Sequence, residues 1–301
     1  LLRDAAGRRG SASVVVVAGP GNNGGDGFVM ARHLRAAGVA VEVVALAPTD
    51  GLRGDARLAA DAYIGVGGGV HDATDGEASF ARLQGASLVV DALFGTGLAR
   101  PLSGLAAQAV EAMATCGAPV LALDVPSGLD GDTGVAHGPV VHATATATFG
   151  GYKPGLLTAK GAAVAGRITV VGLGVPMDLL PPAAPATWIV EQADVAPAFA
   201  PRPPAAHKGT EGHLLIVAGS PGTLGAARLV ARGAHRAGAG LVTLAAPPAA
   251  ADALETTTVE TMTARVASPD DLVARLSGKR AVVMGPGMGT DDAARERVRV
   301  V

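Results

Sequence analysis

The segment that constrains this chain most is residues 14–34, VVVVAGPGNNGGDGFVMARHL. It opens with four consecutive valines, and an uninterrupted β-branched run bounded by turn residues is typical of a strand buried on both faces of a sheet. A glycine- and asparagine-rich stretch follows at 21–27, and a helical pattern begins at Phe28 and ends at Gly38. We therefore predict a strand, a glycine-rich loop and a helix, with loop amides that can converge on an anion at the helix N-terminus.

The alternation of strands and helices continues beyond this segment. Hydrophobic runs bounded by turn residues predict strands, and longer periodic stretches between them predict helices. Such alternation is typical of a doubly wound parallel sheet, so we predict a Rossmann-like α/β domain over residues 1–195. The strands are expected at 39–47, 87–93, 118–125, 140–149 and 167–171, and the helices at 52–63, 77–83 and 102–114.

A proline-rich stretch at residues 196–206 predicts a linker, because proline interrupts both helices and strands. A second α/β pattern follows at 207–301, and it is too short to complete the sheet that it begins. The first residues look like the end of a helix, so we expect sequence to be missing at both ends. The strands of the second pattern are expected at 213–218, 241–245 and 281–284, and its helices at 226–237 and from about 291.

The amino-acid composition argues against several classes of function. The net charge is −2, so nothing favours nucleic acid or an anionic membrane as a partner. No apolar run is long enough to span a membrane. The single cysteine, Cys116, excludes a disulfide framework and indicates a reducing compartment. We therefore expect a cytoplasmic protein that acts on a small molecule, with Cys116 in a packing role.

Polar residues gather where three predicted strands end. In an open α/β sheet, ligands bind beyond the carboxyl ends of the strands, so these residues are expected to line one site. They are Asn22, Asn23 and Asp26 after the first strand, Asp91 with Gly95, Thr96 and Gly97 after the strand at 87–93, and Asp124 with Ser127 after the strand at 118–125.

The glycine spacing also permits a different interpretation. Gly19, Gly21 and Gly24 match the dinucleotide-binding fingerprint, which would indicate a Rossmann-type NAD(P)-dependent oxidoreductase. That fingerprint expects an acidic residue at the end of the second strand to bind the ribose. Here the strand at 39–47 ends in apolar residues and its Glu42 is internal, which disfavours the oxidoreductase. No Walker lysine follows the glycines either, which argues separately against a P-loop nucleotidase. The oxidoreductase is therefore the alternative prediction.

The side chains at these strand ends that could bind a metal are those of Asn, Asp and Ser, and all of them offer oxygen ligands. Such ligands suit a hard cation, and no cluster of histidine and cysteine exists to hold zinc. We predict that Asn23, Asp91 and Ser127 hold one monovalent cation. Together with Asp124, this intact set argues against a third possibility, a binding module without catalytic activity.

Three ordered motifs carry a resemblance to a known family. GNNGGDG at 21–27, DALFGTGLARPLSG at 91–104 and LDVPSGLDGDTG at 123–134 resemble the signatures of NAD(P)H-hydrate epimerase domains, and GYKPGL at 151–156 also fits. The sequence after Lys208, with GPGMG at 285–289, resembles the start of a ribokinase-like NAD(P)H-hydrate dehydratase domain. The chain thus resembles the bifunctional family that repairs hydrated nicotinamide nucleotides.

The resemblance implies a substrate and a division of labour. The first domain would interconvert the R and S forms of NAD(P)H hydrate at C6, and the second would dehydrate the S form with ADP or ATP, with Mg²⁺ as a possible further cofactor. Asp124 would contact the reacting end of the substrate, and we predict that it is the general acid–base. The cation held by Asn23, Asp91 and Ser127 would be K⁺.

The resemblance also transfers binding roles residue by residue. We further expect the protein to be a homo-oligomer. Because the later ribokinase-like motifs are missing, we expect the dehydratase half to be incomplete and this chain to lack dehydratase activity. The implied substrate-binding residues are Asn22, Asn23, Gly24, Gly25, Asp26, Gly95, Thr96, Gly97, Leu98, Ala99, Arg100, Pro101 and Asp124 in the first domain, and Ala226 and Gly287 in the second.

Overall fold

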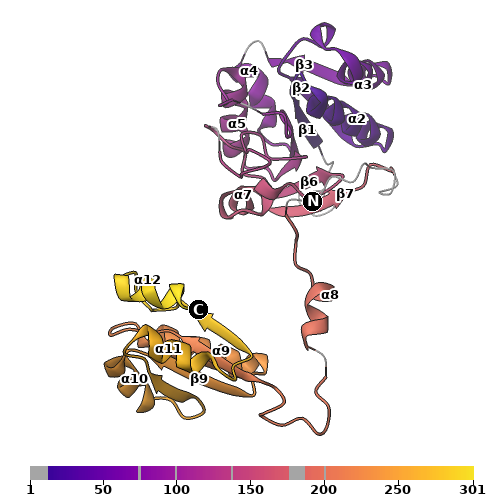
Figure 1. The fold of residues 1–301 in the computed structure, drawn as a ribbon. Coiled ribbons are helices and arrows are strands. Elements are labelled where there is room, and N and C mark those ends of the chain that lie inside the picture. The colour runs from indigo at the N-terminus through magenta and orange to yellow at the C-terminus, as the bar shows by residue number, and fades with distance from the viewer. Residues whose placement is uncertain (1–12, 74–75, 99, 137, 176–186, 200) are drawn as a thin grey trace. The chain divides into compact units, whose positions relative to one another are not determined.

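The computed structural model describes residues 13–73, 76–98, 100–136, 138–175, 187–199 and 201–301. The chain divides into two compact units between Trp188 and Ile189 (Figure 1). The predicted limits at 195 and 206 remain predictions. The short helix α8 (Gln192–Val195) ends just before the predicted linker, and η5 (Ala196–Phe199) occupies its first four residues. Each unit is an α/β structure, as the sequence predicts.

A seven-stranded sheet forms the centre of the first unit. Its order is β3-β2-β1-β4-β5-β6-β7, and every neighbouring pair is parallel. This order confirms the doubly wound sheet, and the strand order reverses between β1 and β4, where a crevice opens beyond the strand ends. The strands are β1 (Ser13–Ala18), β2 (Ala40–Ala45), β3 (Gly69–Asp72), β4 (Leu88–Ala92), β5 (Val120–Leu123), β6 (Ala145–Phe149) and β7 (Arg167–Val171).

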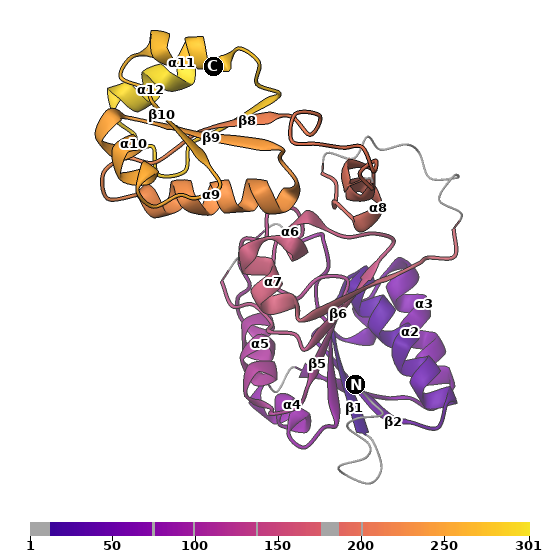
Figure 2. The same ribbon diagram turned by 90° about the horizontal axis from the view of Figure 1, so that it is seen from below.

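Helices cover both faces of this sheet (Figures 1 and 2). One face packs against α2 (Asn22–Ala36) and α3 (Gly54–Gly65), and the other against α4 (Glu77–Phe80), the short helix η3 (Ala81–Leu83) and α5 (Leu105–Thr115). The remaining helical segments of the unit are η1 (Thr49–Gly51), α6 (Pro154–Leu157) and α7 (Ala159–Ala165).

The valines of β1 divide between the two faces because successive side chains of a strand point in opposite directions. Val14 and Val16 belong to the core beneath α2 and α3, whereas Val15 and Val17 belong to the core beneath α5. All four are at most 5% exposed, so the sequence correctly indicated a strand buried on both faces.

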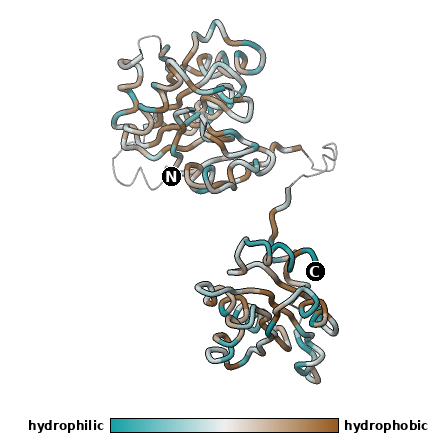
Figure 3. The backbone as a smooth tube through the Cα atoms, turned by 60° about the vertical axis from the view of Figure 1, so that its left-hand side comes forward, coloured by the Kyte–Doolittle hydropathy of each residue, from teal (hydrophilic) through white to brown (hydrophobic). Residues whose placement is uncertain are grey.

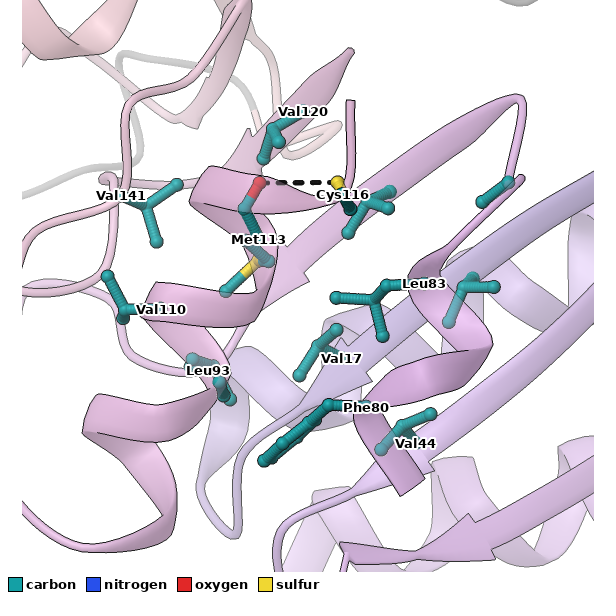
Figure 4. Packing of buried hydrophobic residues seen from close by; sticks show 14 of the residues in the cluster. Val17, Val44, Phe80, Leu83, Leu93, Val110, Met113, Cys116, Val120 and Val141 are labelled. Atoms are coloured by element: carbon teal, nitrogen blue, oxygen red, sulfur yellow. Dashed lines mark hydrogen bonds between the residues drawn. The ribbon is translucent and has the colours of Figure 1, made fainter. Parts of the chain in front are cut away.

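The core beneath α5 contains the single cysteine (Figure 4). Cys116 is buried, and its thiol donates a hydrogen bond to the carbonyl oxygen of Met113, at an Sγ···O distance of 3.2 Å. Phe80 and Leu83 belong to the same cluster. Cys116 therefore has the packing role expected of it.

The predicted loop at 21–27 is wrong, because α2 begins at Asn22 and these residues form its first turns. The glycines serve close packing rather than loop conformation. A Cβ on Gly24 would lie 1.9 Å from the carbonyl oxygen of Gly19, and a Cβ on Gly27 would lie 2.6 Å from the Cβ of Ala92. The helix thus approaches β1 and β4 as closely as backbone allows, and this brings Asn22 and Asn23 to the sheet edge.

Gly24→Ala is expected to destabilise the first unit, because the new methyl group overlaps backbone that cannot move without shifting β1. Overpacking of this kind costs about 1–3 kcal/mol. Urea unfolding of the variant measures the loss. Gly21→Ala is the matched control, since a Cβ there would have nothing within 4 Å, and equal midpoints for the two variants would contradict the packing argument.

Several helices and strands of the first unit were not predicted, and others have bounds that differ from the predicted ones. β3 is a four-residue edge strand, GVHD, with no buried residue, so it lacks the apolar pattern on which strand prediction depends. β6 includes only the second half of the predicted strand at 140–149, and α6 and α7 were not predicted. The predicted helix at 52–63 is shifted to α3, and β7 has the predicted bounds.

The second unit contains a parallel four-stranded sheet of order β10-β9-β8-β11. In both units, hydrophobic segments concentrate in the interior (Figure 3). Among the described residues, no helix is long and apolar enough to cross a membrane. The strands are β8 (His213–Val217), β9 (Leu241–Ala246), β10 (Met262–Arg265) and β11 (Ala281–Met284), and the helices are α9 (Leu224–Ala237), α10 (Pro248–Glu255), α11 (Pro269–Leu276) and α12 (Asp292–Arg299).

Candidate functional site

A cavity of about 440 Å³ lies where the strand order of the first sheet reverses. Its walls come from the start of α2, the segment after β4 and the residue that follows β5, so three segments distant in sequence converge as predicted. The lining residues are Gly21, Asn22, Asn23, Asp26, Leu93, Phe94, Gly95, Thr96, Gly97 and Asp124.

Asp124 occupies an unusual backbone conformation at the end of β5. Its φ is 65°, the one positive φ among the described non-glycine residues. The amide of Val125 donates to the carbonyl oxygen of Leu123, 2.8 Å away, which closes a γ-turn around Asp124. Strained turns of this kind persist only where the surroundings enforce them, and here the Asp124 amide is tied to the carbonyl oxygen of Ala147 in β6 at 2.7 Å.

The two carboxylate oxygens of Asp124 have different surroundings. Oδ1 lies 2.6 Å from the ammonium nitrogen of Lys153, and the hydroxyl of Thr148 and the amide of Phe149 approach it at 3.5 and 3.4 Å. Oδ2 lies on the side of Gly95, where a Cβ would be only 2.9 Å away. Sequence reasoning did not assign Lys153 or Thr148 to the site, although Lys153 belongs to the GYKPGL motif.

Asp26 is the second carboxylate at the cavity. Partial burial raises its pKa, and the negative charge of Asp124 raises it further. Two carboxylates that share a cavity tend to differ in protonation, because both cannot ionise freely. Asp26 is thus the group beside Asp124 that retains a proton more readily than an ordinary aspartate.

Asp91 and Ser127 are expected to line the same site, but neither lines the cavity, and they form a buried pair instead. Asp91 is in β4 and has no exposed surface. The Ser127 hydroxyl donates to Asp91 Oδ1 at 2.6 Å, and the Ser127 amide donates to Oδ2 at 2.8 Å. Burial raises the pKa of Asp91 to about 6, against the opposing effect of the hydrogen bonds from Ser127 and Leu93.

Asn23 is the third residue of the predicted cation site. Its side chain is buried, and neither Oδ1 nor Nδ2 has a hydrogen-bond partner among the described residues. A buried amide without partners is costly, so a ligand is expected there. Asn23 Oδ1 would lie 3.6 Å from a Cβ on Gly95, beside Asp124.

The donor set of these three residues fits a hard cation of low charge. The amide oxygen of Asn23, which has no partner among the residues that the structure describes, and the buried carboxylate of Asp91 offer oxygen ligands. A cation would offset the burial of the Asp91 charge. No group of three or more His, Cys, Asp or Glu side chains could hold a metal ion within the described part of the chain.

Other predicted binding residues lie outside the cavity wall. Gly24 and Gly25 are buried in α2, and Gly25 faces Ala56 of α3. Leu98 is half-buried, Arg100 and Pro101 are exposed, and none of the three lines the cavity. Ala99 lies outside the described residues. Their binding roles remain predictions.

Glu42 is not at the position that a ribose-binding acid would occupy. It lies within β2, three residues before the strand ends at Ala45, and its carboxylate pairs with Arg82 and His71 at 3.1 and 3.3 Å. The end of β2 carries no acidic side chain, so the geometry does not favour the oxidoreductase alternative.

In the second unit, the loops after β8 and β11 meet because these strands are neighbours. The Gly219 amide donates to the carbonyl oxygen of Pro286 at 3.0 Å, and the Thr223 hydroxyl donates to that of Gly287 at 2.7 Å. Ala226, in the first turn of α9, donates its amide to the carbonyl oxygen of Thr223. Ala226 and Gly287 therefore lie at the same sheet edge.

Comparison with known proteins agrees with this arrangement. The family model described as YjeF-related protein N-terminus matches residues 1–155, which is more than half of the chain. The chain belongs to the YjeF-related family. A second family model, described as NAD(P)H-hydrate dehydratase, matches residues 214–301 of this YjeF-related chain.

Curated relatives of the YjeF-related chain are named bifunctional NAD(P)H-hydrate repair enzyme Nnr. The protein from Moorella thermoacetica is 37% identical, over 95% of this chain and 56% of that protein, and the one from Escherichia coli is 34% identical, over 95% and 54%. The chain thus spans about half the length of the curated relatives it matches. A crystal structure of yeast ynu0 is 27% identical, covering 56% of this chain and 69% of that one, with a TM-score of 0.48.

Proposed function

We propose that the first unit interconverts the R and S forms of NAD(P)H hydrate at C6. The observation that carries this proposal is Asp124, whose carboxylate lies in the wall of a cavity formed by three motif segments of a YjeF-related chain. Two relatives that match both units are named NAD(P)H-hydrate repair enzymes. Substrate and activity are proposals for this chain.

Epimerisation requires a proton to move on or off the C6 oxygen and later to move back. If the C6–O bond breaks, the oxygen gains a proton and leaves as water, the lone pair of the ring nitrogen stabilises the planar carbon, and water adds to the opposite face with loss of a proton. If the ring C6–N bond breaks instead, the hydroxyl loses its proton to form a planar aldehyde while the bonding electron pair and a proton pass to the nitrogen, and ring closure on the opposite face reverses these changes. Asp124 accepts or donates this proton through Oδ2, the oxygen on the Gly95 side. One carboxylate within hydrogen-bond reach of the C6 oxygen can perform both steps.

The other cavity residues bind and orient the nucleotide. Asn22 and Thr96 offer side-chain donors and acceptors at the cavity wall, and the start of α2 provides backbone amides suited to a phosphate group. Asp26, with its raised pKa, is available as a hydrogen-bond donor beside Asp124. These contacts place C6 relative to Asp124 and restrict water near it.

We also propose that Asn23, Asp91 and Ser127 hold a potassium ion. When bound, this ion supplies positive charge that offsets the buried carboxylate of Asp91. The proposal is supported by the Asn23 amide, which has no hydrogen-bond partner in the described part of the chain, and by the full burial of Asp91. The Ser127 hydroxyl holds Asp91 in place and also accepts a hydrogen bond from the amide of Phe94 at 3.0 Å, which links the site to the segment that lines the cavity.

The second unit is proposed to belong to a dehydratase that returns the S form to NAD(P)H with ADP or ATP, with Mg²⁺ assisting the nucleotide. The family match to residues 214–301 and the junction of the loops at Gly219 and Gly287 support this assignment. The protein is proposed to act in the cytoplasm as a homo-oligomer, with NAD(P)H hydrate as its small-molecule partner.

Incubation with purified R-hydrate of NADH tests the epimerase proposal. We expect the R and S forms to approach equilibrium faster with the protein than without it, and chromatography of the two epimers measures this. A ratio that changes no faster than in buffer, with substrate binding still detected by calorimetry, would favour a binding module instead.

A further inference from the structure

We propose that Lys153 is the positioning residue for Asp124: it holds Oδ1 so that Oδ2 is the oxygen presented to the substrate. This inference rests on the epimerase function proposed above and adds a residue to it. Lys153 does not line the cavity, so its action is through Asp124 rather than through contact with the substrate.

The Lys153 ammonium group is bound by two partners. It lies 2.6 Å from Asp124 Oδ1, and it donates a hydrogen bond to the carbonyl oxygen of Phe149 at 2.7 Å. The Lys153 and Asp124 side chains are only 18% and 14% exposed. An ion pair so far from solvent is screened much less than a surface pair, so the lysine holds the carboxylate firmly.

The backbone of Lys153 is also fixed. Lys153 is the N-cap of α6 in an extended conformation, and Pro154 at the first helical position favours that conformation. The amide of Gly155, two residues further on, donates to the carbonyl oxygen of Gly131 at 2.7 Å. The lysine stem passes Gly131, where a Cβ would lie 3.6 Å from its Cγ. The backbone and the stem of Lys153 are therefore held in place where its ammonium group reaches Asp124.

The contacts of Asp124 are asymmetric as a result. All its side-chain hydrogen-bond and ion-pair contacts within the described residues reach Oδ1. The terminal torsion of an aspartate has a broad energy minimum, so the weak contacts from Thr148 and Phe149 alone would leave the carboxylate free to rotate. Lys153 supplies the one short contact that fixes its plane, with Oδ2 beside Gly95.

The test is a double-mutant cycle on the full chain with NADH hydrate as substrate. Lys153→Met removes the charge and keeps the length of the stem, and misplacement of a reacting group by about 1 Å can cost roughly 10²-fold in rate. We expect kcat to fall about 10- to 100-fold with KM changed little. Lys160→Met, at an exposed lysine of α7, is the matched control and should retain the parent rate.

The cycle separates a positioning role from a general structural one. In an Asp124→Asn background, Lys153→Met should lower kcat less than about two-fold further, because a positioning residue has nothing left to position. Lys153→Gln keeps a donor without charge and should lie between parent and Lys153→Met; it replaces the methionine variant if that one does not fold.

Two results would overturn the inference. One is an Lys153→Met variant with the parent kcat, and the other is a full 10- to 100-fold loss in the Asp124→Asn background as well. If the parent chain itself does not epimerise the hydrate, the proposed function fails first. In that case the thermal melting points still test the pairing. Lys153→Met should lower the melting point of the parent but should not lower that of Asp124→Asn any further, because the partner of the lysine is already lost.

Discussion

Asp124→Asn is expected to bind NAD(P)H hydrate nearly as tightly as the parent chain and to epimerise it about 10²–10⁴-fold more slowly. The asparagine keeps the size of the side chain and a hydrogen bond, but it cannot accept and return a proton. A fall in kcat at nearly constant KM is the signature of an interaction made only in the transition state. Steady-state kinetics on both epimers measure it.

Substitution at Asp26 provides the comparison for this prediction. Asp26→Asn retains a hydrogen-bond donor at the cavity, which matches the protonated form that the raised pKa favours, so we expect a smaller loss than at Asp124. If Asp124→Asn instead epimerises at the parent rate, Asp124 only orients the substrate. The proton carrier would then be sought at Asp26.

Asp91→Asn is expected to abolish the stabilisation of the fold by potassium. Without a cation, the buried Asp91 destabilises the native state once it ionises. Its pKa is raised from 3.8 to about 6. Protonated Asp91 therefore stabilises the native state fully below pH 4, and this stabilisation is lost as the pH rises through 6. This pKa shift corresponds to about 3 kcal/mol in the free energy of unfolding.

Thermal unfolding in potassium chloride and in choline chloride at equal ionic strength measures this effect. Potassium should raise the melting temperature of the parent at pH 8 and much less at pH 5, where the proton occupies Asp91. The difference between the two salts should vanish in Asp91→Asn. Asp132→Asn, at an exposed position of the loop after β5, should behave as the parent. A parent melting temperature at pH 8 that is equal in the two salts would contradict a cation at this position.

The sequence by itself determined the class of the fold and the edge of the sheet that carries the cavity. The valine run of β1 and the alternation of strands and helices are local patterns, and local patterns specify which elements form. Parallel strands place their carboxyl ends at one edge, so the order of the motifs along the chain is enough to expect that Asn22, Asp26 and Asp124 meet. Their meeting in the cavity wall agrees with that rule.

Only the tertiary structure decided how these residues are held. The glycines at 21–27 have the composition of a loop, yet all but the first lie in α2, where the close approach of the helix to Gly19 and Ala92 leaves no space for a Cβ on Gly24 or Gly27. The positive φ of Asp124 and the pairing of its Oδ1 with Lys153 arise from β6 and α6, whose positions depend on the whole sheet. Contacts between residues distant in sequence carry no local pattern, so the orientation of the carboxylate is a property of the folded chain alone.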